Sequence, residues 1–154
     1  MQRRTFLKGS LAGSTVAVAV SAGLLSPRSV LAAWPKGAFE AKSMQDALSG
    51  LYGNASTTPS GDISIKAPDI AENGAVVPVS VSSKLGGISE IAIMAEKNGQ
   101  PLAANFKLSA NAQGFVSTRI KMGKTSDVIA VVKTNSGTFS ARKNVKVTIG
   151  GCGG

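Results

Sequence analysis

From Asp62 onward the chain is a series of short runs in which apolar and polar residues alternate, and this feature constrains its fold most. The alternating runs span residues 63–67, 77–82, 88–95, 102–108, 115–122 and 138–149, and residues 128–132 are apolar throughout. Turn signals such as Asn98-Gly99 separate the runs at intervals of about 8–12 residues, which is typical of a β-sandwich. The continuous apolar run is typical of a central strand covered on both faces. The sequence therefore predicts an all-β, antiparallel sandwich of about seven short strands.

Pro78 interrupts the alternating run over residues 77–82. Proline cannot donate a hydrogen bond to a neighbouring strand. We therefore expect this strand to lie at a sheet edge or to carry a bulge. Because an edge strand can border another chain, residues 76–82 are also a candidate partner interface.

One short amphipathic helix is predicted before the strands, over residues 44–52. Ser43 is a suitable N-cap, and Gly53-Asn54 is a suitable stop. Apolar side chains recur with the spacing of one helix face at Met44, Ala47, Leu48 and Leu51. Residues 34–42 are predicted to be a lead-in, and residues 55–61, rich in Ser, Thr, Pro and Gly, to be a loop.

Residues 1–32 are predicted to be an export signal. The paired Arg3 and Arg4, followed by a hydrophobic pair and Lys8, are typical of a signal that the twin-arginine translocase reads. A mildly apolar run and small residues then lead to a cleavage site after Ala32, or one residue later. The run is short and weakly apolar for a membrane anchor, which needs about 20 residues. We therefore expect a periplasmic protein whose mature domain spans residues 33–149.

The net charge is +9 over 154 residues, and removal of the signal takes away four cations and no acid, which leaves +5. The remaining basic residues are scattered along the chain and do not interleave with aromatic residues, so nucleic-acid binding is not indicated. A positive surface would attract an anionic substrate or an acidic partner. A solvated face nevertheless accounts for most of these lysines.

The residue types present exclude most catalytic chemistry. There is no histidine and only one cysteine, which excludes a Ser-His-Asp triad, a Cys-His pair and a zinc site of the usual ligands. One cysteine cannot form an internal disulfide, so the fold depends on a hydrophobic core, which a chain of this length can build. The sequence therefore predicts no catalytic residue, no metal and no cofactor, but one reactive thiol.

That thiol belongs to Cys152, in the last five residues, Gly150-Gly151-Cys152-Gly153-Gly154. Glycine has no Cβ and adopts many backbone conformations, so we expect a flexible arm that enters narrow channels. An extended arm carries the sulfur about 10 Å from the folded body. Two other interpretations remain open: an incidental cysteine in a disordered terminus, and a cysteine that links two copies of the chain by an intermolecular disulfide.

The C-terminal residues resemble the GGCGG motif of the SoxY family, the sulfur-carrier subunit of periplasmic thiosulfate oxidation, and all five residues match. Residues 67–79, APDIAENGAVVPV, are similar to the central stretch of that family. The resemblance implies that the sandwich is immunoglobulin-like, with a carrier arm over residues 150–154. It also implies that the chain is a covalent carrier rather than an enzyme. The alternative function is a structural sandwich that dimerises through Cys152.

The resemblance further implies which partners act on the carrier. A c-type cytochrome would join thiosulfate oxidatively to Cys152, and a hydrolase would then release sulfate. Whether a sulfane dehydrogenase oxidises the remaining persulfide stays open. The carrier would form a heterodimer with a SoxZ-type subunit, a second small β-sandwich.

Overall fold

The computed structural model describes residues 35–148, which belong to the second of two units in the chain, Met1–Trp34 and Pro35–Gly154. The described residues form two helices and nine strands. The helices are α2 (Lys36–Glu40) and α3 (Met44–Tyr52). The strands are β1 (Thr58–Pro59), β2 (Ile63–Lys66), β3 (Ile70–Ala71), β4 (Val77–Ser83), β5 (Ile88–Ala95), β6 (Leu102–Lys107), β7 (Phe115–Ile120), β8 (Ser126–Thr134) and β9 (Gly137–Val147).

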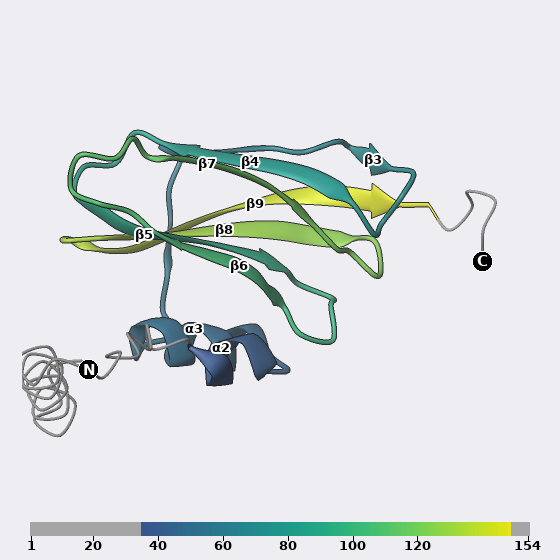
Figure 1. The fold of residues 1–154 in the computed structure, drawn as a ribbon, viewed down its shortest axis with the longest axis horizontal. Coiled ribbons are helices and arrows are strands. Elements are labelled where there is room, and N and C mark those ends of the chain that lie inside the picture. Colours follow the sequence, from purple (N-terminus) through teal and green to yellow (C-terminus); the bar gives the residue numbers. More distant parts are fainter. Residues whose placement is uncertain (1–34, 149–154) are drawn as a thin grey trace, which may run out of the picture. The chain divides into compact units, whose positions relative to one another are not determined.

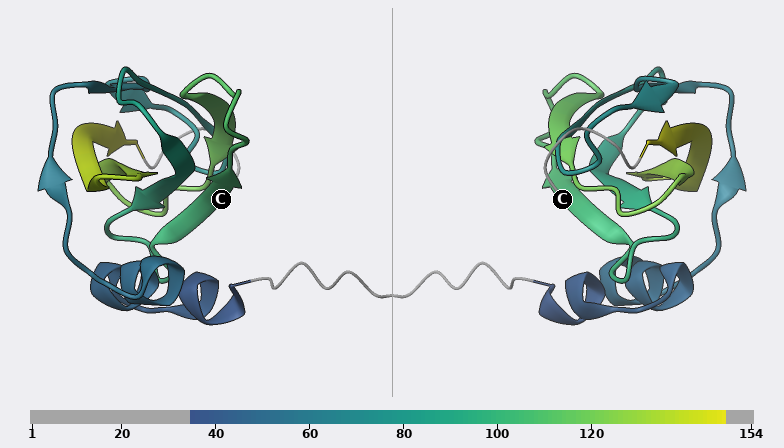
Figure 2. Two further views of the ribbon diagram at one scale, coloured as in Figure 1. Left: turned by 90° about the vertical axis from the view of Figure 1, so that its left-hand side faces the viewer. Right: turned by 90° about the vertical axis from the view of Figure 1, so that its right-hand side faces the viewer.

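Two sheets pack face to face, and the helices cover the outer face of the larger sheet (Figures 1 and 2). The large sheet has the order β1-β9-β8-β5-β6, with β3 also paired to β9, and the small sheet has the order β2-β4-β7. All pairings are antiparallel except those of β1 and β3, which run parallel to β9. The predicted β-sandwich with a short N-terminal helix is therefore confirmed.

The core has two parts because the central strands of the large sheet are covered on both faces. In β8, Val128, Ala130 and Val132 contribute to the cluster between the two sheets. The alternate residues Ile129 and Val131 contribute to the cluster beneath the helices. Side chains that follow one another along a strand point to opposite faces, so a continuous apolar run fills both clusters. The prediction of a central strand over residues 128–132 is confirmed.

The capping residues predicted for the helix over residues 44–52 fix both ends of α3. The Ser43 Oγ accepts a hydrogen bond from the Asp46 N–H at 3.1 Å. At the other end Gly53 has a φ of 70°, and its N–H donates to the Ser49 carbonyl at 2.8 Å. A positive φ suits glycine, and such a residue commonly ends a helix.

Three short elements differ from the sequence prediction. The expected lead-in contains α2, the expected loop contains β1, and β3 lies between two predicted strands. Each has five residues or fewer, too few to show a periodic pattern. The last strand was predicted to end at Ile149; β9 ends at Val147, and Ile149 lies outside the described residues.

The expectation that Pro78 marks an edge strand or a bulge is wrong. Its strand, β4, is the middle strand of the small sheet, and its register with β7 is continuous. The reason is that β2 is short and ends at Lys66, opposite Ser80. Ser83 donates its N–H towards β7 and Lys84 donates towards β2, so even-numbered residues face β2. The missing N–H of Pro78 therefore faces the space beyond the end of β2, where no hydrogen bond to that strand is lost.

Candidate functional site

The predicted carrier residues follow directly after the described part of the chain. Cys152 and the glycines at positions 150, 151, 153 and 154 lie outside the described residues, as do Arg3 and Arg4. Their roles therefore stay predictions. The structure does describe the residues that lead into the motif, Lys146, Val147 and Thr148, which we call the arm base.

Strand β3 holds one side of the arm base through main-chain hydrogen bonds. The Lys146 N–H donates to the Asp69 carbonyl at 2.9 Å, and the Thr148 N–H donates to the Ala71 carbonyl at 3.1 Å. The Thr148 hydroxyl donates to the same Ala71 carbonyl at 3.4 Å. The carbonyls of Asp69, just before β3, and of Ala71, at its end, therefore hold the last residues of β9 on this side.

A threonine side chain holds the opposite side of the arm base. Strand β8 begins at Ser126, opposite Val145, so no β8 main chain lies opposite Val147. Thr125 replaces it: its Oγ1 accepts from the Val147 N–H at 2.9 Å and donates to the Val147 carbonyl at 3.4 Å. The final residues of β9 are thus bonded on both sides.

Gly74 packs directly against the arm base. Its carbonyl accepts a hydrogen bond from the Met122 N–H at 2.7 Å. A Cβ placed on Gly74 would lie 2.8 Å from the Val147 Cγ1 and would collide with the Met122 carbonyl oxygen. Only glycine fits this approach. The stretch over residues 67–79, on which the family resemblance partly rests, therefore lies against the residues that precede the glycine motif.

A lysine adds a further attachment between this stretch and β9. The Lys143 Nζ lies 3.1 Å from the Asp69 Oδ1 and donates to the Ala67 carbonyl at 2.8 Å. The Asp69 side chain is 91% exposed, whereas that of Lys143 is only 32% exposed. Because water screens so exposed a carboxylate, the ion pair with Asp69 contributes little. The hydrogen bond from Lys143 to the Ala67 carbonyl is therefore the main attachment.

A second feature lies at the same end of the sandwich, where Figure 1 shows the β5–β6 turn, the β7–β8 turn and the end of β9. It is a hollow of about 700 Å³, which we call the basic hollow. Its described lining holds no acidic residue and four basic ones: Lys97, Arg119, Lys121 and Lys124. All four are exposed. The Asn98 side chain joins its two turns, since it donates to the Lys121 carbonyl at 2.7 Å and accepts from the Gly123 N–H at 3.0 Å.

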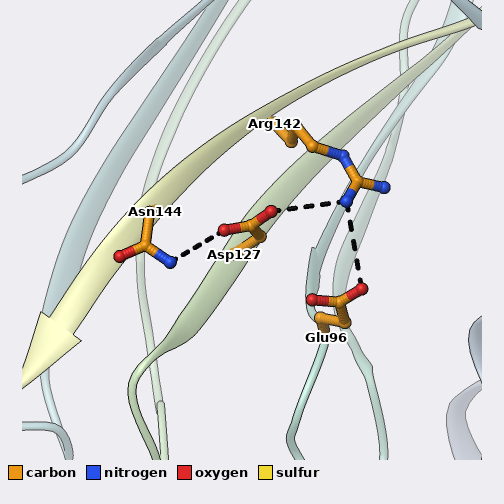
Figure 3. A network of polar contacts seen from close by, with 4 residues as sticks. All are labelled: Glu96, Asp127, Arg142 and Asn144. Carbon is orange, nitrogen blue, oxygen red and sulfur yellow. Dashed lines mark hydrogen bonds and ion pairs between the residues drawn. The ribbon is translucent and has the colours of Figure 1, made fainter.

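Glu96 and Asp127, two acidic residues at this end of the sandwich, are already paired with Arg142 (Figure 3). The Arg142 Nη1 lies 3.3 Å from the Asp127 Oδ2 and 4.0 Å from the Glu96 Oε1. The Asn144 amide donates to the other Asp127 oxygen at 2.9 Å. Their carboxylates therefore interact with Arg142 and not with the cations of the basic hollow.

Sequence reasoning missed the basic hollow because its four cations come from two segments that are more than twenty residues apart in the sequence. Lys97 lies in the β5–β6 turn, whereas Arg119, Lys121 and Lys124 lie at the end of β7 and in the turn that follows it. Along the chain they look like scattered solvated lysines, and only the fold brings them together. The sequence gives one signal: Lys97, Lys121 and Lys124 each lie within two residues of a turn glycine, Gly99 or Gly123.

A buried polar group on the helix side has a packing role. Burial, and secondarily the charge of Glu90, raises the pKa of Tyr52 far above its usual value. The Tyr52 hydroxyl has no hydrogen-bond partner among the described residues, and the Lys133 Nζ lies 5.2 Å from its ring centre. Tyr52 therefore stays protonated at neutral pH and supplies no acid–base chemistry there.

The described residues form neither a metal site nor a membrane-spanning helix. Between residues 35 and 148 no three His, Cys, Asp or Glu side chains are grouped so that they could hold a metal ion. No helix in the same range is long and apolar enough to cross a bilayer.

Comparisons with known proteins match the chain to a family model and to several solved structures. A family model described as sulfur oxidation protein SoxY matches residues 48–152. The sulfur carrier protein SoxY from Chlorobium limicola f thiosulfatophilum is 38% identical, with a TM-score of 0.61, and the match covers 68% of this chain and 94% of that chain. A superoxide reductase (neelaredoxin) from Ignicoccus hospitalis is 22% identical, with a TM-score of 0.50 over 56% of this chain and 80% of that one, which indicates a shared fold alone. No curated protein matches the chain.

Proposed function

Because the chain belongs to the SoxY family of sulfur oxidation proteins, we propose that it carries sulfur intermediates covalently on the Sγ of Cys152. The observation that carries this proposal is that the family match extends to residue 152, the only cysteine, within the GGCGG motif. The arm base supports it, because β9 is bonded on both sides up to Thr148. Cys152 is the fourth residue after Thr148, so the thiol reaches at most about 14 Å from this fixed point.

The proposed chemistry begins with the thiol and thiosulfate. The Cys152 sulfur and the sulfane sulfur of thiosulfate form a new S–S bond, which releases one proton from the thiol and passes two electrons to a c-type cytochrome. The product is a cysteine S-thiosulfonate. Water then cleaves the bond between sulfur and the sulfonate group, which leaves a persulfide on Cys152 and releases sulfate and two protons. A free thiol is mostly protonated near pH 7, but its thiolate fraction is a strong nucleophile.

The partners in this proposal follow from the family. They are a SoxZ-type subunit in a heterodimer, the c-type cytochrome and the sulfate-releasing hydrolase, with a sulfane dehydrogenase as a further enzyme for the persulfide. Export by the twin-arginine route through Arg3 and Arg4 would bring the folded carrier to the periplasm. The N-terminal sequence of the exported chain tests this placement, and it should begin at Ala33, or at Trp34 if cleavage falls one residue later.

Replacement of the thiol is the direct test of carrier function. The Cys152→Ser variant should lose thiosulfate-dependent electron flow at least a hundredfold, because a hydroxyl is a far weaker nucleophile than a thiolate and forms no persulfide. Its urea unfolding curve should match that of the wild type. Intact-mass spectrometry of wild-type protein from sulfur-grown cells should show sulfur adducts on Cys152. Full activity of the serine variant with the reconstituted enzymes would reject the proposal.

The glycines test whether the arm must enter other active sites. The Gly151→Val/Gly153→Val variant keeps the thiol but adds β-branched bulk and removes positive-φ conformations. It should react with a small alkylating reagent at the wild-type rate and fail with the enzymes. If Cys152 only links two copies of the chain, this variant should instead be fully functional, and wild-type protein should show only a doubled mass.

A further inference from the structure

The cations of the basic hollow are uncompensated within the described part of the chain. Four acidic residues form ion pairs there, and their cationic partners are Lys36, Arg142 and Lys143. None of the four cations of the hollow takes part in these pairs. Like charges repel one another. The negative charge of a bound partner would relieve this repulsion.

The basic hollow also adjoins the arm base. Lys124 precedes Thr125, the residue whose side chain bonds both main-chain groups of Val147. Cys152 is the fifth residue after Val147, so the thiol lies within about 18 Å of this point. An enzyme whose active site holds the Cys152 sulfur is therefore brought close to this end of the sandwich, where the four cations lie.

The turn that bears two of these cations is fixed in place by its neighbours. Met122, between Lys121 and Lys124, is buried, and its N–H donates to the Gly74 carbonyl. Asn98 bonds the same turn to the β5–β6 turn. The main chain that carries the charges is thus preorganised, which lowers the ordering cost of an encounter.

From these observations we propose that the basic hollow is a docking surface for the acidic face of a protein, namely of the enzymes that act on Cys152. The inference rests on the proposed carrier function. A protein face fits better than a small oxyanion because all four cations are exposed, and because both polar groups of the Asn98 side chain are already bonded within the chain. Exposed charges of one sign steer protein association and set its rate, whereas small-anion sites use enclosed donors.

The test compares two pairs of lysines with the same charge change. Lys121→Gln/Lys124→Gln removes two cations of the hollow, and Lys84→Gln/Lys107→Gln removes two exposed lysines that form no ion pair with any described residue. Lys84 follows β4 and Lys107 ends β6, at the opposite end of the sandwich (Figure 1). The readout is steady-state kinetics of the sulfate-releasing hydrolase of the same organism on the thiosulfate-loaded full chain, at several NaCl concentrations.

We expect the Lys121/Lys124 variant to raise KM about tenfold at low salt with kcat unchanged, and the control variant to raise it less than twofold. The difference should shrink as salt shortens the screening length. Equal effects of the two variants would overturn the inference while the carrier function stands. A wild-type chain that the hydrolase does not turn over would reject the carrier function and the docking surface together.

A small oxyanion is the competing ligand, and a second measurement distinguishes it. Sodium sulfate is added to the wild-type chain, and the amide NMR shifts of Gly99 and Gly123, which line the hollow, are followed. Shifts no larger than those caused by NaCl at equal ionic strength support a protein partner. Saturable shifts that the Lys121/Lys124 variant loses would assign the hollow to a small anion and overturn the proposal.

Discussion

The arm base and the basic hollow lie at the same end of the sandwich, yet their polar groups are satisfied in opposite ways. In the arm base the main-chain groups of Lys146, Val147 and Thr148 find partners within the chain, in β3 and in Thr125. Around the hollow, the Asn98 side chain bonds the main chain of the neighbouring turn. The four charged side chains are exposed and form no ion pair with a described acidic residue.

This difference distinguishes groups that hold the fold together from groups that are left to contact a second molecule. Bonds such as those of the arm base fix where the C-terminal segment begins, and their loss should appear as lost stability. Charges such as those of the hollow contribute nothing to internal bonding, and their loss should appear only when a second molecule is present. Stability measurements on the isolated chain can therefore distinguish the two kinds of group.

The largest effect on stability is expected at Gly74. The Gly74→Ala variant places a Cβ against the Met122 carbonyl and the Val147 side chain, so it should lower the free energy of unfolding by about 1–3 kcal/mol. Gly99 lines the basic hollow and has no atom within 4 Å of such a Cβ, which makes Gly99→Ala the matched control. Urea unfolding measures both. Equal stabilities of the two variants would contradict the tight packing of the arm base.

A smaller effect is expected at Thr125. Thr125→Val keeps the shape of the side chain but removes both bonds to Val147, so it should cost about 1 kcal/mol. Hydrogen exchange should accelerate at the Val147 amide. The Thr148 amide, which donates to β3, serves as the internal control and should keep its protection. Unchanged exchange at Val147 would show that Thr125 does not hold the strand.

A still smaller effect is expected at the exposed ion pair. Asp69→Asn removes the charge partner of Lys143 but leaves its bond to the Ala67 carbonyl, so the loss should stay below about 0.5 kcal/mol. Lys121→Gln, in the basic hollow, should change stability even less, because its side chain has no ion-pair partner among the described residues. Thermal melts at low salt resolve the order. A larger loss for Lys121→Gln would place the hollow among the structural features.

The sequence predicted the parts of the fold that depend on patterns among neighbouring residues. The run over residues 128–132 indicates a strand buried on both faces, and β8 is such a strand. Ser43 and Gly53 fix the ends of α3 through local hydrogen bonds, so neighbouring residues suffice to predict them. The carrier role of Cys152 stays a prediction, and it too depends on a local pattern, since its motif is five consecutive residues.

What sequence could not predict depends on contacts between distant segments. β1 and β3 exist only because β9 offers them main-chain partners, and two residues carry no pattern of their own. Pro78 is tolerated in a middle strand because a different strand, β2, ends early. The basic hollow depends on the approach of two turns that Asn98 joins across more than twenty residues of sequence.

The pairing of β1 and β3 with β9 has a consequence for the behaviour of many copies in solution. A bare strand edge invites addition of a strand from another molecule, which leads to aggregation. β1 covers β9 at Phe139 and Ser140, β3 covers it at Lys146 and Val147, and Lys143 reaches across between them to Ala67. Two copies that meet near their reactive ends therefore find no long free edge on β9 to extend into a shared sheet, and the chain can be concentrated without stacking through this strand.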